Sequence, residues 1–242
     1  MTFWRCSIPL FLVFLGLPAS RADVVLYNGT GSASELNGSR VGWYGSSQFS
    51  QAQSFTNTYE GATITSISAW LQQGSSTMTG SFNLKLFAST GTPGTTATPT
   101  GAALFSTNYL TSYVPSLTST AQQVSFTGLN WSVNANTSYF FAFDATNMTG
   151  SSSLANYFFL QSSDPFVGSQ NEAYSTNSLS SWTSTVIGST HPTAAATVYA
   201  SVPEPGTLIL LALAQGVFAA GWLVRRYRKK PAGLATLQLQ GG

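Results

Sequence analysis

Apolar and polar residues alternate along many short stretches of the chain between residues 23 and 201. Successive side chains of a strand point to opposite faces, so this alternation predicts half-buried β-strands. In one stretch, Phe82, Leu84 and Leu86 share one face, while Asn83 and Lys85 share the other. Two further stretches show the same pattern: ATITSISAWLQQ has Ile67, Ala69 and Leu71 on one face, and QQVSFTGLN has Val124 and Phe126. In a third, TSYFFAFDA, Tyr139, Phe141 and Phe143 are predicted to point inward, and Phe140 and Asp144 lie on the other side.

The connections between these stretches predict the fold class. They are rich in glycine, serine, threonine, asparagine and proline, and no useful length of the chain has a helical period. Ser89–Gly101 is predicted to be a loop, because Pro93 and Pro99 are incompatible with a central strand. Many short strands with such turns favour an all-β fold. We expect a single antiparallel β-sandwich, jelly-roll-like, over residues 23–201.

The N-terminus has the pattern of a secretory signal peptide over residues 1–22. Arg5 supplies the positive region, and Ile8–Leu17 is an apolar run of ten residues. Small residues, Ser20 and Ala22, precede Asp23, so cleavage is expected between Ala22 and Asp23. The run is well short of the ~20 residues needed to cross a membrane.

The C-terminus has an apolar run that is long enough to span a bilayer. Thr207–Val224 contains 18 residues, which as a helix would extend roughly 27 Å. A transmembrane helix is therefore expected over residues 206–224, followed by a basic cytoplasmic tail over residues 225–242. The basic residues that would hold the end of this helix in the cytoplasm are Arg225, Arg226, Arg228, Lys229 and Lys230.

Pro203, Glu204 and Pro205 directly precede this run, and the whole segment resembles a PEP-CTERM sorting signal. Val202–Pro205, an apolar helix and an arginine-rich cluster follow one another in that order. The resemblance implies recognition by an exosortase, a membrane-embedded cysteine protease or transpeptidase, and processing near residues 202–205. It also implies a membrane-anchored precursor that is then displayed on the outer surface or in the extracellular matrix of a polysaccharide-producing bacterium.

The middle of the chain is similar to the choice-of-anchor R domain. The resemblance rests on AQSFT, ITSISAWLQ, GSFNLKLFAS and VSFTGLNWSVNANTSYFFAF, which together span Gln51 to Asp144. It implies a β domain of the cell surface and adds no enzymatic activity.

Composition and charge exclude several classes of function. Only 7% of all residues are charged, and residues 23–201 contain two basic and six acidic residues, a net charge of −4. Nucleic-acid binding needs many lysine and arginine contacts to phosphates, so it is not expected. The single cysteine, Cys6, lies in the predicted signal peptide. With one histidine, His191, and no cysteine cluster, we expect no zinc site, no cofactor and no catalytic residue set.

Two classes of function remain. The first is a structural or interaction protein of the cell surface or biofilm matrix, which is not an enzyme. The second is a carbohydrate-binding module that holds extracellular polysaccharide, with Trp43, Tyr44 and Trp182 as candidate contacts, since VGWYGSS and SLSSWTS place aromatic rings in loop-like settings. A polysaccharide hydrolase would need two carboxylates facing each other at a fixed separation, which spacing along the chain does not reveal.

Overall fold

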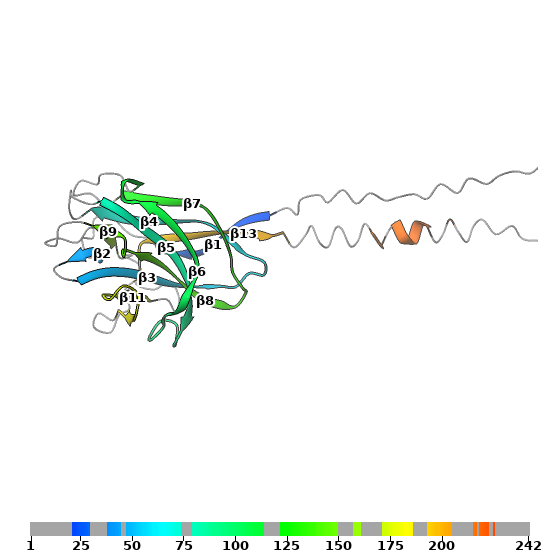
Figure 1. Cartoon of the computed structure of the whole chain (residues 1–242). Coiled ribbons are helices and arrows are strands. Elements are labelled where there is room, and N and C mark those ends of the chain that lie inside the picture. The colour runs from blue at the N-terminus through cyan, green and yellow to red at the C-terminus, as the bar shows by residue number, and fades with distance from the viewer. Residues whose placement is uncertain are drawn as a thin grey trace, which may run out of the picture. The chain divides into compact units, whose positions relative to one another are not determined.

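The structure is a computed structural model that describes residues 21–29, 38–44, 47–73, 79–113, 122–149, 157–160, 171–185 and 193–204, together with 215–216, 218–222 and 225 in the C-terminal part. For residues 38–40, 43–44, 72–73 and 157–160 it describes the backbone only. The compact unit formed by the strands spans Ala22–Val202 (Figure 1).

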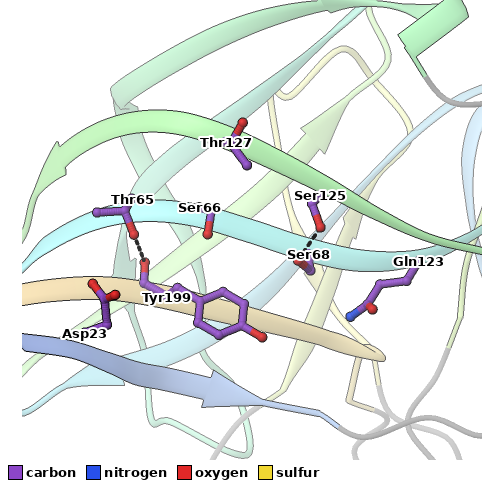
Figure 2. Close-up of a pocket in the computed structure, with 8 residues that line it drawn as sticks. All are labelled: Asp23, Thr65, Ser66, Ser68, Gln123, Ser125, Thr127 and Tyr199. Atoms are coloured by element: carbon purple, nitrogen blue, oxygen red, sulfur yellow. Dashed lines mark hydrogen bonds between the residues drawn. The ribbon is translucent and has the colours of Figure 1, made fainter.

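The fold is all-β with two antiparallel sheets, as the alternation predicts. The first sheet, called sheet 1 here, has four neighbouring strands, and Figure 2 shows them side by side. In order across the sheet they are β1 (Arg21–Asn28), β13 (Ala196–Pro203), β4 (Thr63–Gln73) and β7 (Gln122–Ser132).

The second sheet, called sheet 2 here, is built around the long strands in the middle of the chain. Its order is β3 (Ser47–Asn57), β8 (Thr137–Asp144), β5 (Thr79–Thr90) and β6 (Thr98–Leu110). Short elements pair along its margins: β9 (Met148–Thr149) with β5, β11 (Glu172–Ser175) with β3, and β12 (Thr183–Ser184) with β11. A short 3-10 helix, η1 (Thr111–Tyr113), follows β6.

The hydrogen-bonded path continues from one sheet to the other. β10 (Tyr157–Leu160) pairs with the end of β4 and with β2 (Gly38–Tyr44), and β2 pairs with β3. Segments that are far apart in the sequence are therefore joined along one side of the sandwich.

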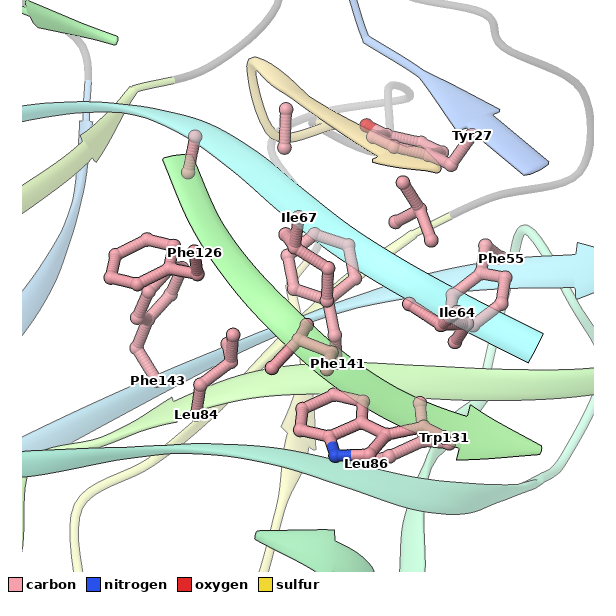
Figure 3. Packing of buried hydrophobic residues seen from close by; sticks show 14 of the residues in the cluster. Tyr27, Phe55, Ile64, Ile67, Leu84, Leu86, Phe126, Trp131, Phe141 and Phe143 are labelled. Atoms are coloured by element: carbon pink, nitrogen blue, oxygen red, sulfur yellow. The ribbon is translucent and has the colours of Figure 1, made fainter. Parts of the chain in front are cut away.

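The main core lies between the two sheets (Figure 3). Inward-facing residues of β4 and β7 meet those of β5 and β8, and Phe82 contacts Phe126 edge to face at a ring separation of 5.8 Å. The structure confirms the predicted inward faces, because every residue predicted there is buried. These residues are Ile67, Ala69, Leu71, Phe82, Leu84, Leu86, Val124, Phe126, Tyr139, Phe141 and Phe143.

The outer face of sheet 2 carries a second, smaller core. Phe140 lies opposite Phe141 on β8, as predicted, yet its side chain is completely buried. It clusters with Ala52, Phe87, Ala97, Ala142 and Ala173, and Leu179 and Trp182 pack against this cluster. Residues 171–185 thus cover a sheet face that alternation alone would leave facing water.

Asn171 ties this covering segment to its surroundings. Its side-chain amide donates to the carbonyl oxygen of Ala97 at 2.8 Å and to the Ser184 hydroxyl at 3.1 Å. Its side-chain oxygen accepts the Gly94 backbone N–H at 3.3 Å. Because Asn171 is fully buried, these bonds satisfy polar atoms that would otherwise be costly to remove from water.

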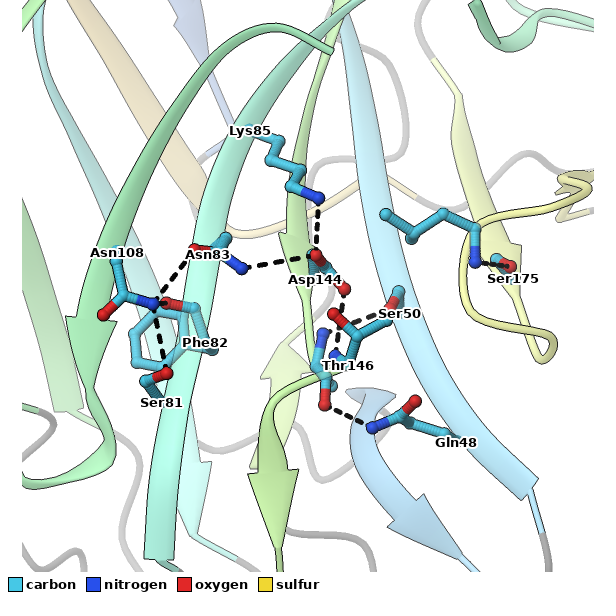
Figure 4. A network of polar contacts seen from close by, with 12 residues as sticks. Gln48, Ser50, Ser81, Phe82, Asn83, Lys85, Asn108, Asp144, Thr146 and Ser175 are labelled. Atoms are coloured by element: carbon cyan, nitrogen blue, oxygen red, sulfur yellow. Dashed lines mark hydrogen bonds and ion pairs between the residues drawn. The ribbon is translucent and has the colours of Figure 1, made fainter. Parts of the chain in front are cut away.

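The same face of sheet 2 ends in a polar network (Figure 4). Lys85 Nζ lies 2.7 Å from Oδ2 of Asp144, whose side chain is fully buried. The other carboxylate oxygen of Asp144 accepts the Thr146 N–H at 2.9 Å. The predicted outward direction of Asn83, Lys85 and Asp144 is therefore correct, and the charged pair is held by hydrogen bonds at the strand end.

Tyr27 joins the end of β1 to the segment that leads into β13. Its buried hydroxyl donates to the Ala194 carbonyl at 2.6 Å. Burial, and then the charge of Glu172, raise the pKa of Tyr27 well above its ordinary value, while a hydrogen bond with Thr193 acts in the opposite direction. A Cβ at Gly29 would collide with both the Tyr27 hydroxyl and the Ala194 carbonyl, so the close approach requires glycine.

The loop predicted over residues 89–101 is shorter in the structure. β5 continues through Thr90, and β6 already begins at Thr98. Pro99 lies in β6, which forms an edge of sheet 2 and pairs with β5 alone among the described strands. An edge strand tolerates proline because one side of it needs no ladder hydrogen bond, so the prediction for this stretch was wrong at both ends.

Candidate functional site

The sorting segment continues directly from β13. Val202 is 7% exposed and belongs to the main core, and Pro203 is the last residue of the strand. Glu204 follows outside the strand and is half-buried. Among the described residues, the paired and packed backbone therefore ends at Pro203, where the loss of an N–H donor is tolerated.

Much of the predicted membrane segment lies outside the described residues. Pro205 lies outside, as do Arg226, Arg228, Lys229 and Lys230. Gln215, Gly216, residues 218–222 and Arg225 are helical. No described helix has the length and apolar character needed to cross a membrane.

The predicted signal-peptide cleavage site lies at the start of β1. Ala22 packs partly against the main core, whereas Asp23 is exposed. β1 is the hydrogen-bonded neighbour of β13 in an antiparallel sheet, and the side chains of Asn28 and Thr197 form a hydrogen bond. The two ends of the compact unit, Ala22 and Val202, consequently lie at the same end of sheet 1.

The three aromatic residues predicted as carbohydrate contacts occupy different settings. Trp43 and Tyr44 end strand β2 and pair with Gln48 and Ser47, so the expected loop setting is wrong for them. Their side chains lie outside the described part of the structure. Trp182 does lie outside the strands, but its ring packs edge-on against Phe87, with ring centres 5.8 Å apart.

Trp182 therefore helps to cover the outer face of sheet 2. It is partly buried and contacts the second core together with Leu179. This packing anchors the loop that carries the ring, and the sugar contact expected at Trp182 stays a prediction.

A groove that the aromatic pattern did not predict lies on the outer face of sheet 1 (Figure 2). It encloses about 380 Å³ and draws its walls from all four strands of the sheet. Five hydroxyl-bearing side chains line it together with an amide, a phenol and a carboxylate. The residues are Thr65, Ser66 and Ser68 of β4, Gln123, Ser125 and Thr127 of β7, Tyr199 of β13 and Asp23 of β1.

Strand register brings these residues together. Ser66 pairs with Tyr199 of β13, and Ser68 pairs with Ser125 of β7. The hydroxyl oxygens of Ser68 and Ser125 lie 2.8 Å apart, and the Thr65 hydroxyl donates to the Tyr199 carbonyl oxygen at 3.4 Å. These cross-strand bonds hold part of the groove floor in place before any ligand arrives.

A sequence signal for the groove does exist, in the polar half of the alternation. Ser66 and Ser68 alternate with the inward residues Ile67 and Ala69. Serines and threonines at outward positions are ordinary on a solvated sheet, so the pattern shows the face without showing which other strands contribute to it. Among the residues that the structure describes, no group of acidic, histidine or cysteine side chains is arranged to hold a metal ion.

Comparison with known proteins bears on the C-terminal segment. No curated protein and no solved structure matches the chain. The resemblance of Gln51–Asp144 to the choice-of-anchor R domain therefore stays a prediction. A family model of the PEP-CTERM protein-sorting motif matches residues 201–229, which run from the last residues of β13 to the basic cluster. The chain thus carries a PEP-CTERM sorting motif, which implies an exported, membrane-anchored precursor that is processed by an exosortase.

Proposed function

We propose that this protein is displayed on the outer surface, or in the extracellular matrix, of a polysaccharide-producing bacterium, where its β-sandwich has a structural or interaction role. In this proposal the signal peptide, residues 1–22, directs export, and the helix over residues 206–224 holds the precursor in the membrane. The basic residues after the helix keep its end in the cytoplasm. The domain has no catalytic role.

One observation carries the proposal: the sorting motif begins in a strand of the folded domain. Ser201 pairs with Thr63, and Val202 is buried in the main core. A protease binds its substrate in an extended form that is free of other pairing. Pro203 and Pro205 keep the intervening Glu204 from entering a helix. Processing after Pro203 would leave sheet 1 complete and release the whole sandwich.

Replacing Pro203, Glu204 and Pro205 together with alanine tests this proposal. Val202 is left unchanged, because removing it would damage the core. In the native bacterium, the variant should remain in the membrane fraction as a longer chain, whereas the wild type is shorter and leaves that fraction. Immunoblots of membrane, cell-surface and culture fractions measure the difference.

The matched control is Glu60→Ala, which removes an exposed acidic residue elsewhere on the domain. It should be processed like the wild type. A triple variant with wild-type size and location would refute sorting through residues 203–205. Equal thermal unfolding temperatures for all three proteins would show that the fold is preserved.

A further inference from the structure

We propose that the groove on the outer face of sheet 1 binds a segment of uncharged polysaccharide, with the Tyr199 ring as its stacking surface. This site differs from the aromatic residues expected from the sequence, Trp43, Tyr44 and Trp182. The inference extends the proposed surface role by naming a ligand class. It requires neither exosortase processing nor a particular anchor.

The size and form of the groove suit part of a sugar chain. Its volume of about 380 Å³ lies within the range of roughly 300–1,000 Å³ for small-molecule sites. The lining residues lie along four neighbouring strands, so the groove crosses the sheet (Figure 2). A polymer can lie across such a face without having to enter the molecule end first.

The lining chemistry matches sugar hydroxyls. Serine and threonine hydroxyls both donate and accept hydrogen bonds, as sugar hydroxyls do, and Gln123 adds an amide with both capacities. These short side chains lose little rotamer entropy when a ligand orders them, in contrast to long ones such as lysine. The bond between Ser68 and Ser125 already orients two of them.

An aromatic ring supplies the apolar contact that a sugar also needs. Tyr199 alternates with the buried Val198 and Ala200, so its half-buried ring lies on the outer face. Trp70 pairs with Gln123 and follows Ser68 by two residues, which places it on the same face beside the groove. One ring inside the groove and one next to it can stack on successive sugar units.

The charges of the lining residues favour a neutral polymer. Asp23 is the one charged side chain among the eight, and its exposed carboxylate can accept hydrogen bonds from two sugar hydroxyls. The net charge of −4 on the side chains of residues 23–201 disfavours an anionic polysaccharide or a nucleic acid. A second copy of this chain fits less well, because the centre of a protein interface is more apolar than this lining.

Affinity electrophoresis of the full chain in a neutral detergent tests the inference. Native gels contain hydroxyethyl cellulose, dextran or galactomannan as uncharged polymers, or alginate as an anionic one. At least one uncharged polymer should retard the wild type. In that gel, Tyr199→Ala and Thr127→Lys should each weaken binding at least tenfold, whereas Tyr199→Phe should retain it. The basic residues 225–230 of the full chain can themselves bind alginate, so any retardation by alginate should be the same for the wild type and Tyr199→Ala.

Tyr59→Ala is the matched control, since Tyr59 is 42% exposed and lies outside the groove. Circular dichroism and thermal unfolding verify the fold of each variant, and Thr127 is itself exposed, so its replacement should not disturb the core. The inference would be overturned if both groove variants were retarded as strongly as the wild type, or if no uncharged polymer retarded the wild type. Weaker retardation of Tyr199→Ala than of the wild type by alginate would also overturn it. None of these results changes the expected outcome for the sorting variant, which is measured by size and location.

Discussion

The two outer faces of the sandwich differ, although both belong to antiparallel sheets with the same inward pattern. The outer face of sheet 2 bears Phe87 and Phe140, and residues 171–185 cover it. The outer face of sheet 1 bears mostly polar side chains around an open groove, together with the partly exposed rings of Tyr199 and Trp70. Burial of the outer face of sheet 2 contributes to the stability of the domain, whereas the groove on the outer face of sheet 1 is open to solvent.

This difference has a simple physical origin. A large apolar side chain on an outer face must be covered, since fully burying a phenylalanine is worth about 1.5–3 kcal/mol relative to exposure. Serine and threonine gain little from being covered and lose their hydrogen bonds to water unless replacements are supplied. The composition of each face therefore decides whether the chain returns to cover it.

The largest expected effect is on the covered face. Replacing Phe140 with alanine should lower the free energy of unfolding by about 3–5 kcal/mol, because it leaves a cavity beneath the covering segment. Urea unfolding, followed by circular dichroism, measures the change. The matched substitution on the open face, Thr127→Ala, should remain within about 0.5 kcal/mol of the wild type. Similar losses for the two variants would contradict the distinction between the faces.

A smaller effect is expected from Asn171→Ala. This change leaves the Ala97 carbonyl and the Gly94 N–H without their side-chain partner, which should reduce stability by about 1–3 kcal/mol. Limited proteolysis should also cut faster within residues 171–185, since this residue anchors the covering segment. Asn130→Ala, at an exposed position of β7, is the control. Unchanged proteolysis of the Asn171 variant would show that the cover does not depend on these bonds.

The smallest effect concerns Tyr27, where the end of β1 meets the segment leading into β13. Tyr27→Phe should cost about 1 kcal/mol near pH 8, because the bond to the Ala194 carbonyl is lost. Burial raises the pKa of folded Tyr27, whereas the unfolded phenol keeps a pKa of about 10. The unfolded state therefore releases its proton first as the pH rises, and the contribution of Tyr27 is lost above about pH 10. The stability difference between wild type and variant should shrink in urea titrations at pH 11, and a constant difference would contradict this account.

The main core could be predicted because its signal is local. Each inward residue of β4, β5, β7 and β8 is identified by its neighbours in the chain, as Leu84 is by Asn83 and Lys85. The burial of Phe140 could not be predicted in this way. Its cluster includes Ala173, which lies more than thirty residues further along the chain and is brought beside Ala52 because β11 pairs with β3.

The two candidate sites differ in the same way in how far the sequence could predict them. The sorting motif is contiguous, so its order of prolines, apolar run and basic residues could be recognised directly. The groove combines Asp23, Ser68, Ser125 and Tyr199 from four strands, and only their register makes them neighbours. For Trp182, the polar neighbours in the sequence suggested a binding loop. The structure shows that the ring packs against Phe87, which lies far away in the sequence.

By itself, the sequence determined the strand pattern, the inward faces and the PEP-CTERM motif with the export that it implies. Each of these is carried by a contiguous segment of the chain, where the strand period or a linear motif is sufficient. Only the tertiary structure decided which outer face is covered, where the groove lies, and that Val202 belongs to the core. Each depends on pairing between distant strands, and the energy of that pairing comes from burial that no single segment can achieve alone.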